Sequence, residues 1–202
     1  MTAPSTCPST IAGVEHLVRA RLLGRSVLIR LHVNEHEAAR REAAGTGALT
    51  DISLLQILAA LPAWVPFPWS GLSRREQRIL RSAPPGVLER AGGTARRLVV
   101  PAANVESVTV EARSGAAGLA AASAYAPYCR RTAAIPTADA DDETTLLDAK
   151  LYGVGIAVRQ SGQYLQVVEP APFTQRRWTW ASWLFHEQAW AQAVRPTPGQ
   201  LV

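Results

Sequence analysis

The stretch Asn104-Val-Glu-Ser-Val-Thr-Val-Glu-Ala-Arg113 opens the part of this 202-residue chain that decides its fold. It alternates apolar with polar side chains, which is typical of a β-strand with one buried face. An alanine-rich segment over residues 115–128 has helix-forming composition, and a further strand is expected over residues 131–135. A second helix is expected over residues 144–152, and a last strand follows it. This order predicts an α/β core over residues 96–170.

On the N-terminal side of this core, the sequence predicts mostly helices. Helices are expected over residues 11–23, 34–44, 50–61 and 73–81, and strands over residues 26–33 and 97–100. Ser73 followed three residues later by Glu76 is a capping-box pattern that marks a helix start. Residues 1–95 are therefore predicted to form a mainly helical extension. A tryptophan-rich helix at about 177–194, within residues 171–202, is expected to pack on the core.

The composition indicates a folded protein without a membrane-spanning segment. Hydrophobic residues make up 48% and charged residues 18% of the chain, enough apolar content for a core and too little charge for disorder. The sequence has no run of about 18 apolar residues, and from its N-terminal residues no secretory leader is expected. Cys7 and Cys129 have no spacing typical of a disulfide framework or zinc site. The expected location is cytoplasmic.

The basic residues are almost all arginine, with Lys150 the only lysine, and the formal net charge is +5. Guanidinium groups match phosphate geometry, so clustered arginines favour contact with a polyanion such as DNA. A solvated face on a mildly basic protein is the alternative. The candidate nucleic-acid contacts are Arg74, Arg75, Arg78, Arg130, Arg131, Arg176, Arg177 and the neighbouring Trp178.

Glu111 and Arg113 lie two residues apart on the expected strand, hence on one face of it. A carboxylate beside a fixed cation suits phosphodiester hydrolysis. The carboxylate helps to hold a divalent metal that activates water, and the cation stabilises the charge that develops on phosphorus. Solvent-facing residues of an edge strand would show the same pattern.

The residues from Glu106 to Gly155 resemble the PD-(D/E)XK, or restriction-endonuclease-like, superfamily. In this resemblance Glu106 matches the first acid, Glu111 the glutamate and Arg113 the lysine, and Gly153-Val-Gly155 matches the second helix-to-strand turn. The resemblance implies a mixed sheet flanked by helices. It also implies that Glu106 and Glu111 hold Mg²⁺ while Arg113 stabilises charge during DNA hydrolysis.

Three departures from the family pattern leave the activity open. Glu106 replaces the usual aspartate, Arg113 replaces the lysine and cannot act as a base, and the two glutamates are five residues apart. In a regular strand such residues face opposite ways unless a bulge intervenes. One hypothesis is a Mg²⁺-dependent nuclease. The others are an inactive nuclease fold that binds DNA, a protein partner or a second copy, and an interaction protein with an incidental basic surface.

Other motifs have simpler interpretations. His32-Val-Asn-Glu-His36 spells H-x-x-E-H, but its two histidines are expected on different elements. The acidic run from Asp139 to Glu143 is expected at a helix N-terminus, where carboxylates are favoured, with a second metal position as the alternative. Gly153 is interpreted as a helix stop. The tryptophans of residues 178–190 are expected mainly in a packing stripe, with base stacking as the alternative.

Overall fold

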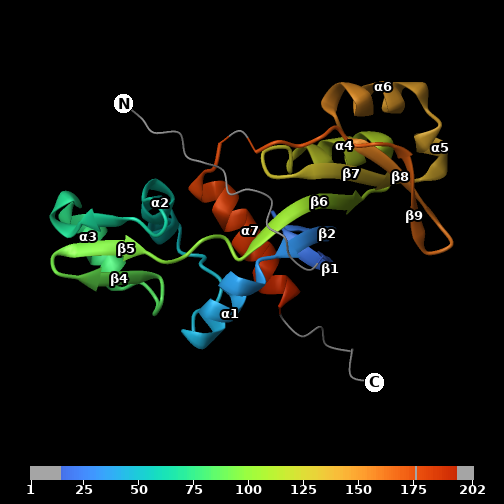
Figure 1. Ribbon diagram of the computed structural model, residues 1–202. Helices are drawn as coiled ribbons and strands as arrows, with labels where there is room; N and C mark the ends of the chain where they lie inside the picture. Colours follow the sequence, from blue (N-terminus) through green and yellow to red (C-terminus); the bar gives the residue numbers. More distant parts are fainter. Residues whose placement is uncertain (1–14, 176, 195–202) are drawn as a thin grey trace, which may run out of the picture. The chain divides into compact units, whose positions relative to one another are not determined.

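The computed structural model describes residues 15–175 and 177–194 as an α/β protein with seven α-helices, a mixed six-stranded sheet and a small three-stranded sheet (Figure 1). These residues divide into two units, each assembled from segments that are far apart in the sequence. Unit 1 comprises residues 32–104 and 177–194, and unit 2 comprises residues 15–31 and 105–175. No helix in the described segments combines the length and apolar character needed to cross a membrane.

The six-stranded sheet has the order β1-β2-β6-β7-β8-β9. Strands β6, β7 and β8 run parallel to one another, and β9 is antiparallel to β8. Parallel neighbours need crossover connections, which the predicted helices supply. The strands are β1 (Glu15–Leu22), β2 (Arg25–Val33), β6 (Ala103–Glu111), β7 (Arg130–Ile135), β8 (Gly155–Gln160) and β9 (Gln163–Val168).

The helices of unit 2 are α4 (Gly115–Ser123), α5 (Thr137–Ala140) and α6 (Glu143–Tyr152), and α4 and α6 cover one side of β7 and β8 (Figure 1). Close packing of α4 requires a glycine, because a Cβ built on Gly118 would lie 2.7 Å from Ile135 Cγ2 and 3.0 Å from Ala133 Cβ. The predicted helix stop is confirmed, since Gly153 ends α6 with a φ of 65°.

The prediction of a helix over residues 11–23 is wrong for the described residues, because β1 occupies Glu15–Leu22. Every second residue of β1 is more buried, ending in Ala20 and Leu22, which is the period of a strand. A two-residue turn then leads into β2, with φ values of 50° at Leu23 and 78° at Gly24. The described part of the N-terminal region therefore begins with a hairpin and not with a helix.

Unit 1 confirms most of the other predicted elements. The predicted helix over residues 34–44 is α1, capped by Asn34, and the capping box of Ser73 and Glu76 opens α3. The strand expected at residues 97–100 is misplaced, because β5 ends at Arg97 and residues 98–100 lie outside any strand. The elements are α1 (Glu35–Ala43), α2 (Ile52–Ala60), β3 (Pro66–Pro68), the 3₁₀ turn η1 (Trp69–Gly71), α3 (Arg74–Arg81), β4 (Leu88–Ala91), β5 (Thr94–Arg97) and α7 (Trp180–Ala193).

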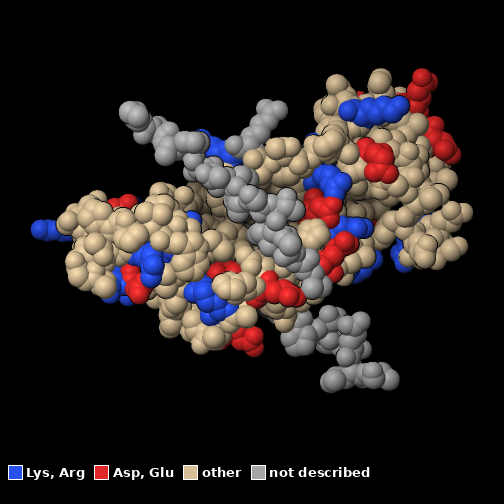
Figure 2. Space-filling model, in the orientation of Figure 1, with Lys and Arg blue, Asp and Glu red and all other residues tan. Residues whose placement is uncertain are grey.

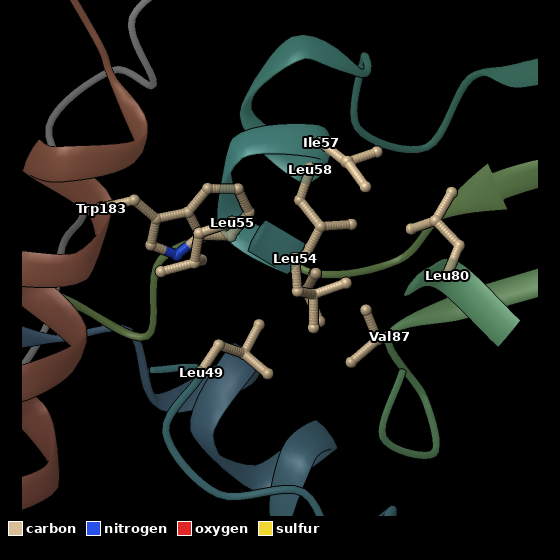
Figure 3. Close-up of a cluster of buried hydrophobic side chains, with 9 residues drawn as sticks. Leu49, Leu54, Leu55, Ile57, Leu58, Leu80, Val87 and Trp183 are labelled. Carbon is tan, nitrogen blue, oxygen red and sulfur yellow. The ribbon is translucent and has the colours of Figure 1, made fainter. Parts of the chain in front are cut away.

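The core of unit 1 lies around α2, one face of which is fully apolar (Figure 3). Trp183 of α7 is completely buried there, so the central member of the tryptophan stripe has a packing role. Burial of such side chains is the main stabilising contribution to a unit of this size. The buried cluster consists of Leu49, Leu54, Leu55, Ile57, Leu58, Leu80, Val87, Val99 and Trp183.

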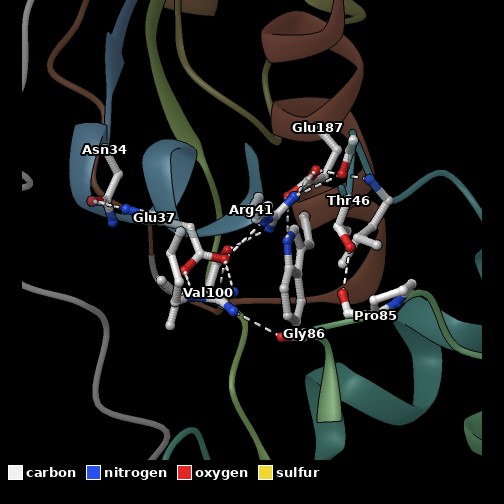
Figure 4. A network of polar contacts seen from close by, with 12 residues as sticks. Asn34, Glu37, Arg41, Thr46, Pro85, Gly86, Val100 and Glu187 are labelled. Carbon is white, nitrogen blue, oxygen red and sulfur yellow. Dashed lines mark hydrogen bonds and ion pairs between the residues drawn. The ribbon is translucent and has the colours of Figure 1, made fainter. Parts of the chain in front are cut away.

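A buried ion-pair network joins α1 to α7 in unit 1 (Figure 4). The guanidinium of Arg41 donates to both carboxylate oxygens of Glu187, at 2.7 and 2.8 Å, and to Glu37 at 2.7 Å. All three side chains are at most 1% exposed. Arg41 also donates to the Val100 carbonyl at 2.6 Å and lies over the Trp190 ring. The charges are thus compensated inside the unit.

Candidate nucleic-acid interface and carboxylate cluster

Glu111 lies at the end of β6 with its carboxylate already engaged. Its Oε1 accepts hydrogen bonds from the Tyr164 hydroxyl of β9 and from Arg19 Nη2 of β1, the latter at 3.0 Å. Arg19 also donates to the Tyr164 oxygen at 3.4 Å. The hydrogen bond from Tyr164, followed by that from Arg19, lowers the pKa of Glu111 below its usual value. Glu111 is therefore a stably ionised group with two partners.

Glu106 is bound to a different cation. Its carboxylate forms an ion pair with Arg130, the first residue of β7. Five residues of extended strand separate Glu106 from Glu111, which corresponds to roughly 16 Å between their Cα atoms. No cluster of three or more histidine, cysteine, aspartate or glutamate side chains suited to a metal occurs within residues 15–175 and 177–194. The two predicted metal ligands thus lie apart, each beside its own guanidinium.

Arg113 lies two residues beyond the end of β6, in the exposed turn before α4. Among the described residues, the guanidinium that contacts Glu111 belongs to Arg19 rather than to Arg113. Sequence reasoning missed Arg19 and Tyr164 because they are 92 and 53 residues away from Glu111 along the chain. No local spacing pattern could have joined three strands of one sheet.

The acidic run before α6 has the structural role expected of it. Asp142 caps α6 by accepting from the Thr145 backbone N–H at 2.7 Å, and Asp139 accepts from the Gly115 backbone N–H at 2.6 Å. His32 lies in β2 and His36 in α1, so the H-x-x-E-H letters fall on two elements as expected. Asp139 and Asp142 therefore serve local structure.

The arginines of α3 occupy one side of that helix. At about 100° per residue, Arg74, Arg75, Arg78 and Arg81 fall within an arc of roughly 120°. All four are exposed, whereas Leu80 on the opposite side is buried in the core. Within the described residues, Arg74, Arg75 and Arg78 form no hydrogen bond or ion pair. Three cationic groups are therefore directed to solvent with no acidic side chain bound to them.

Trp69 connects α3 to the β4–β5 hairpin. The guanidinium of Arg90 in β4 lies 4.2 Å from the Trp69 ring centroid, and that of Arg81 lies 5.8 Å from it. Such contacts hold a cation over an aromatic face. Beside them is an open hollow of about 170 Å³, lined by Trp69, Arg90, Ala91, Gly92, Gly93 and Thr94. Helix and hairpin thus share one cationic surface.

The acidic residues near this surface are already engaged. Glu76 accepts from the backbone N–H and hydroxyl of Ser73, and this lowers its pKa. Glu89 pairs with Arg96 across the hairpin. In the space-filling view, blue arginine side chains and red carboxylates both lie over the region of α3, β4 and β5 (Figure 2). The unengaged charge of this region is therefore positive.

Most of the other predicted nucleic-acid contacts already interact with groups inside the protein. Arg130 is paired with Glu106, and Arg131 donates to the Tyr152 carbonyl. Trp178 stacks on His186 with ring centroids 5.2 Å apart and planes 4° from parallel, so its ring is already stacked inside unit 1. Arg177 is exposed, and Arg176 lies outside the described residues.

Comparison with protein families, curated proteins and solved structures finds no match to this chain. Its function is therefore inferred from the arrangement of its arginines and carboxylates.

Proposed function

We propose that the protein binds DNA and that its nuclease-like sheet does not hydrolyse the phosphodiester backbone. The observation that carries this proposal is the exposed arc of α3, where Arg74, Arg75 and Arg78 have no intramolecular acceptor among the described residues. Unpaired guanidinium groups on a rigid helix bind phosphate without first having to break an internal ion pair.

The carboxylates of unit 2 favour binding over hydrolysis. The Mg²⁺ site implied by the nuclease resemblance needs Glu106 and Glu111 to converge on one ion, whereas each of them is bound to a different arginine. The order β6, α4, β7, α5, α6, β8 includes the strands and helices expected from the nuclease resemblance, with the short helix α5 in addition. The proposal therefore retains the nuclease-like fold but includes no Mg²⁺-dependent hydrolysis, as in the hypothesis of an inactive nuclease fold.

Fluorescence anisotropy with a labelled DNA duplex at increasing salt tests the binding. Three phosphate contacts give a slope of about −2.7 for log K against log salt, so affinity should fall roughly 40-fold between 50 and 200 mM salt. Absence of binding at low salt would overturn the proposal.

Plasmid incubation with Mg²⁺ or Mn²⁺ tests the second half of the proposal. Glu111→Gln serves as the matched variant, because it keeps the shape of the side chain and removes its charge. We expect no cleavage that depends on Glu111. Cleavage by the wild-type protein that disappears in Glu111→Gln would show a hydrolytic site instead.

A further inference from the structure

We infer that α3 and the β4–β5 hairpin form the DNA-contacting head of the protein, with α3 inserted in the major groove of a duplex and the hairpin on the adjacent phosphates. This inference rests on the proposed DNA binding and adds the site, the form of DNA and the residues that contact it.

The dimensions of α3 suit the major groove. An α-helix with its side chains is about 10–12 Å across, and the major groove of B-DNA is about 12 Å wide. Arg74 and Arg78 are one turn apart, a rise of about 6 Å, which is close to two base-pair steps. Arginine on a helix in this groove can reach guanine edges bidentately or flanking phosphates.

Helix α3 is held in position at its N-terminus and on its buried face. Ser73 and Glu76 complete a reciprocal capping box, and the Gln77 side chain donates to the carbonyls of Trp69 and Leu72 at 3.2 and 3.0 Å. Leu80 anchors the opposite face in the core. The exposed arginines therefore project from a rigid support, which lowers the ordering cost of binding.

The hairpin offers a second contact beside the helix. Gly92 and Gly93 form its tight turn with φ values of 55° and 80°, and no atom lies within 4 Å of a Cβ built on either. Backbone without side chains can approach a phosphate closely. Arg90, held over Trp69 next to this turn, supplies the charge. Because Trp69 also contacts Arg81, the hairpin contact continues directly from the helix.

This geometry distinguishes duplex DNA from other nucleic acids. The major groove of A-form RNA is too deep and narrow for side chains to read, and a single strand has no groove. We therefore expect a DNA duplex to bind at least about 10-fold tighter than an RNA duplex or single strand of the same sequence. Equal affinity for the three would overturn the major-groove placement.

The decisive comparison uses two variants that lose the same charge. Arg74→Ala/Arg78→Ala should weaken duplex binding at least about 10-fold and make the salt slope shallower by about 1.8. Arg25→Ala/Lys150→Ala removes two exposed cations from unit 2 and should stay within about 2-fold of wild type with an unchanged slope. Both variants should keep the wild-type circular dichroism, since alanine is favourable in the helices of Arg74, Arg78 and Lys150. Arg25 is an exposed residue at the start of β2, where a substitution has little effect on stability.

A third variant tests the hairpin separately. Arg90→Ala should weaken binding about 3- to 10-fold and reduce the salt slope by about 0.9. If the wild-type protein binds DNA but the α3 and hairpin variants match it in affinity and slope, the DNA contact lies elsewhere and this inference is wrong. If the wild-type protein binds no DNA, the proposed function itself fails.

Discussion

Substituting Glu187 by glutamine should destabilise unit 1 by about 3–5 kcal/mol, because it breaks the buried ion pair with Arg41. Both side chains are inaccessible to solvent, so water cannot replace the lost interaction. The Arg41 charge would keep only Glu37, which Arg40 also contacts at 2.8 and 2.9 Å. The substitution therefore leaves a buried cation with too little compensating charge.

A count of hydrogen-bond donors gives the same magnitude. Four donors converge on the Glu187 carboxylate: Arg41 Nη1 and Nη2, the Leu49 backbone N–H at 2.9 Å and Trp183 Nε1 at 2.9 Å. Each carboxylate oxygen accepts two of them. A glutamine has one accepting oxygen, and its NH₂ group would face two donors, so at least two hydrogen bonds are lost. At about 1.5–3 kcal/mol for each bond to a charged group, the cost is again several kcal/mol.

Urea unfolding followed by two signals measures this effect in unit 1. All six tryptophans lie in unit 1 and all four tyrosines lie in unit 2, so tryptophan fluorescence reports on unit 1 alone. With a slope of about 2 kcal/mol/M, the midpoint of the fluorescence transition should fall by roughly 2 M. Tyrosine absorbance follows unit 2 in the same samples.

Two further variants control for the loss of charge. Glu42→Gln removes an exposed carboxylate from the same helix as Arg41 and should change stability by less than about 0.5 kcal/mol. The double substitution Arg41→Met/Glu187→Met should be more stable than Glu187→Gln alone, since it removes both members of the buried ion pair and leaves Glu37 in contact with Arg40. A Glu187→Gln midpoint within experimental error of wild type would refute the energetic role given to the ion pair.

Three other predictions follow from single contacts. Burial lowers the pKa of His186 to about 4, whereas its unfolded value is 6.5. Between these two values the unfolded chain binds more protons than the folded one, so the free energy of unfolding of unit 1 should fall by up to about 3 kcal/mol as the pH falls through this range. A fluorescence-detected stability that stays constant from pH 7 to 4 would contradict this prediction. Tyr164→Phe should raise the pKa of Glu111, measured by NMR titration of its carboxyl carbon, because the hydroxyl stabilises the ionised form; an unchanged pKa would count against that hydrogen bond. Gly118→Ala should cost about 1–3 kcal/mol by forcing α4 away from β7, whereas Gly47→Ala, with no atom within 4 Å of the added Cβ, should be nearly neutral in the same denaturation assay.

The sequence predicted most of the helices and parallel strands because their signals are local. The capping pairs at Ser73 and Asp142, the helix stop at Gly153 and the alternation of residues 104–111 each act over a few residues. The prediction failed at β1, where Leu17, Val18 and Leu22 fitted a helical spacing, whereas the alternation of the strand places Leu17 on its exposed face. Pairing with β2 decided the matter, since a strand needs a neighbour to satisfy its backbone groups.

Of the candidate sites, too, the sequence predicted only the features that depend on residues close together in the chain. The arginines of α3 share one arc because helix geometry alone places them there, so their grouping was readable from the sequence. The partners of Glu111 were not, because Arg19 and Tyr164 come from the first and last strands of the six-stranded sheet. Nor was the contact of Arg90 with Trp69, which depends on how the hairpin folds back toward η1.

The sequence by itself therefore determined the α/β class, the starts of α3 and α6, the end of α6 and the cationic character of α3. Only the tertiary structure decided that Glu106 and Glu111 bind different arginines, that Trp183 packs against α2, and that helix and hairpin share Trp69. The physical reason is the separation along the chain over which each kind of interaction acts. Propensity, capping and periodicity act between near neighbours in the chain, whereas ion pairs, core packing and cation–π contacts join residues that only the folded chain brings together.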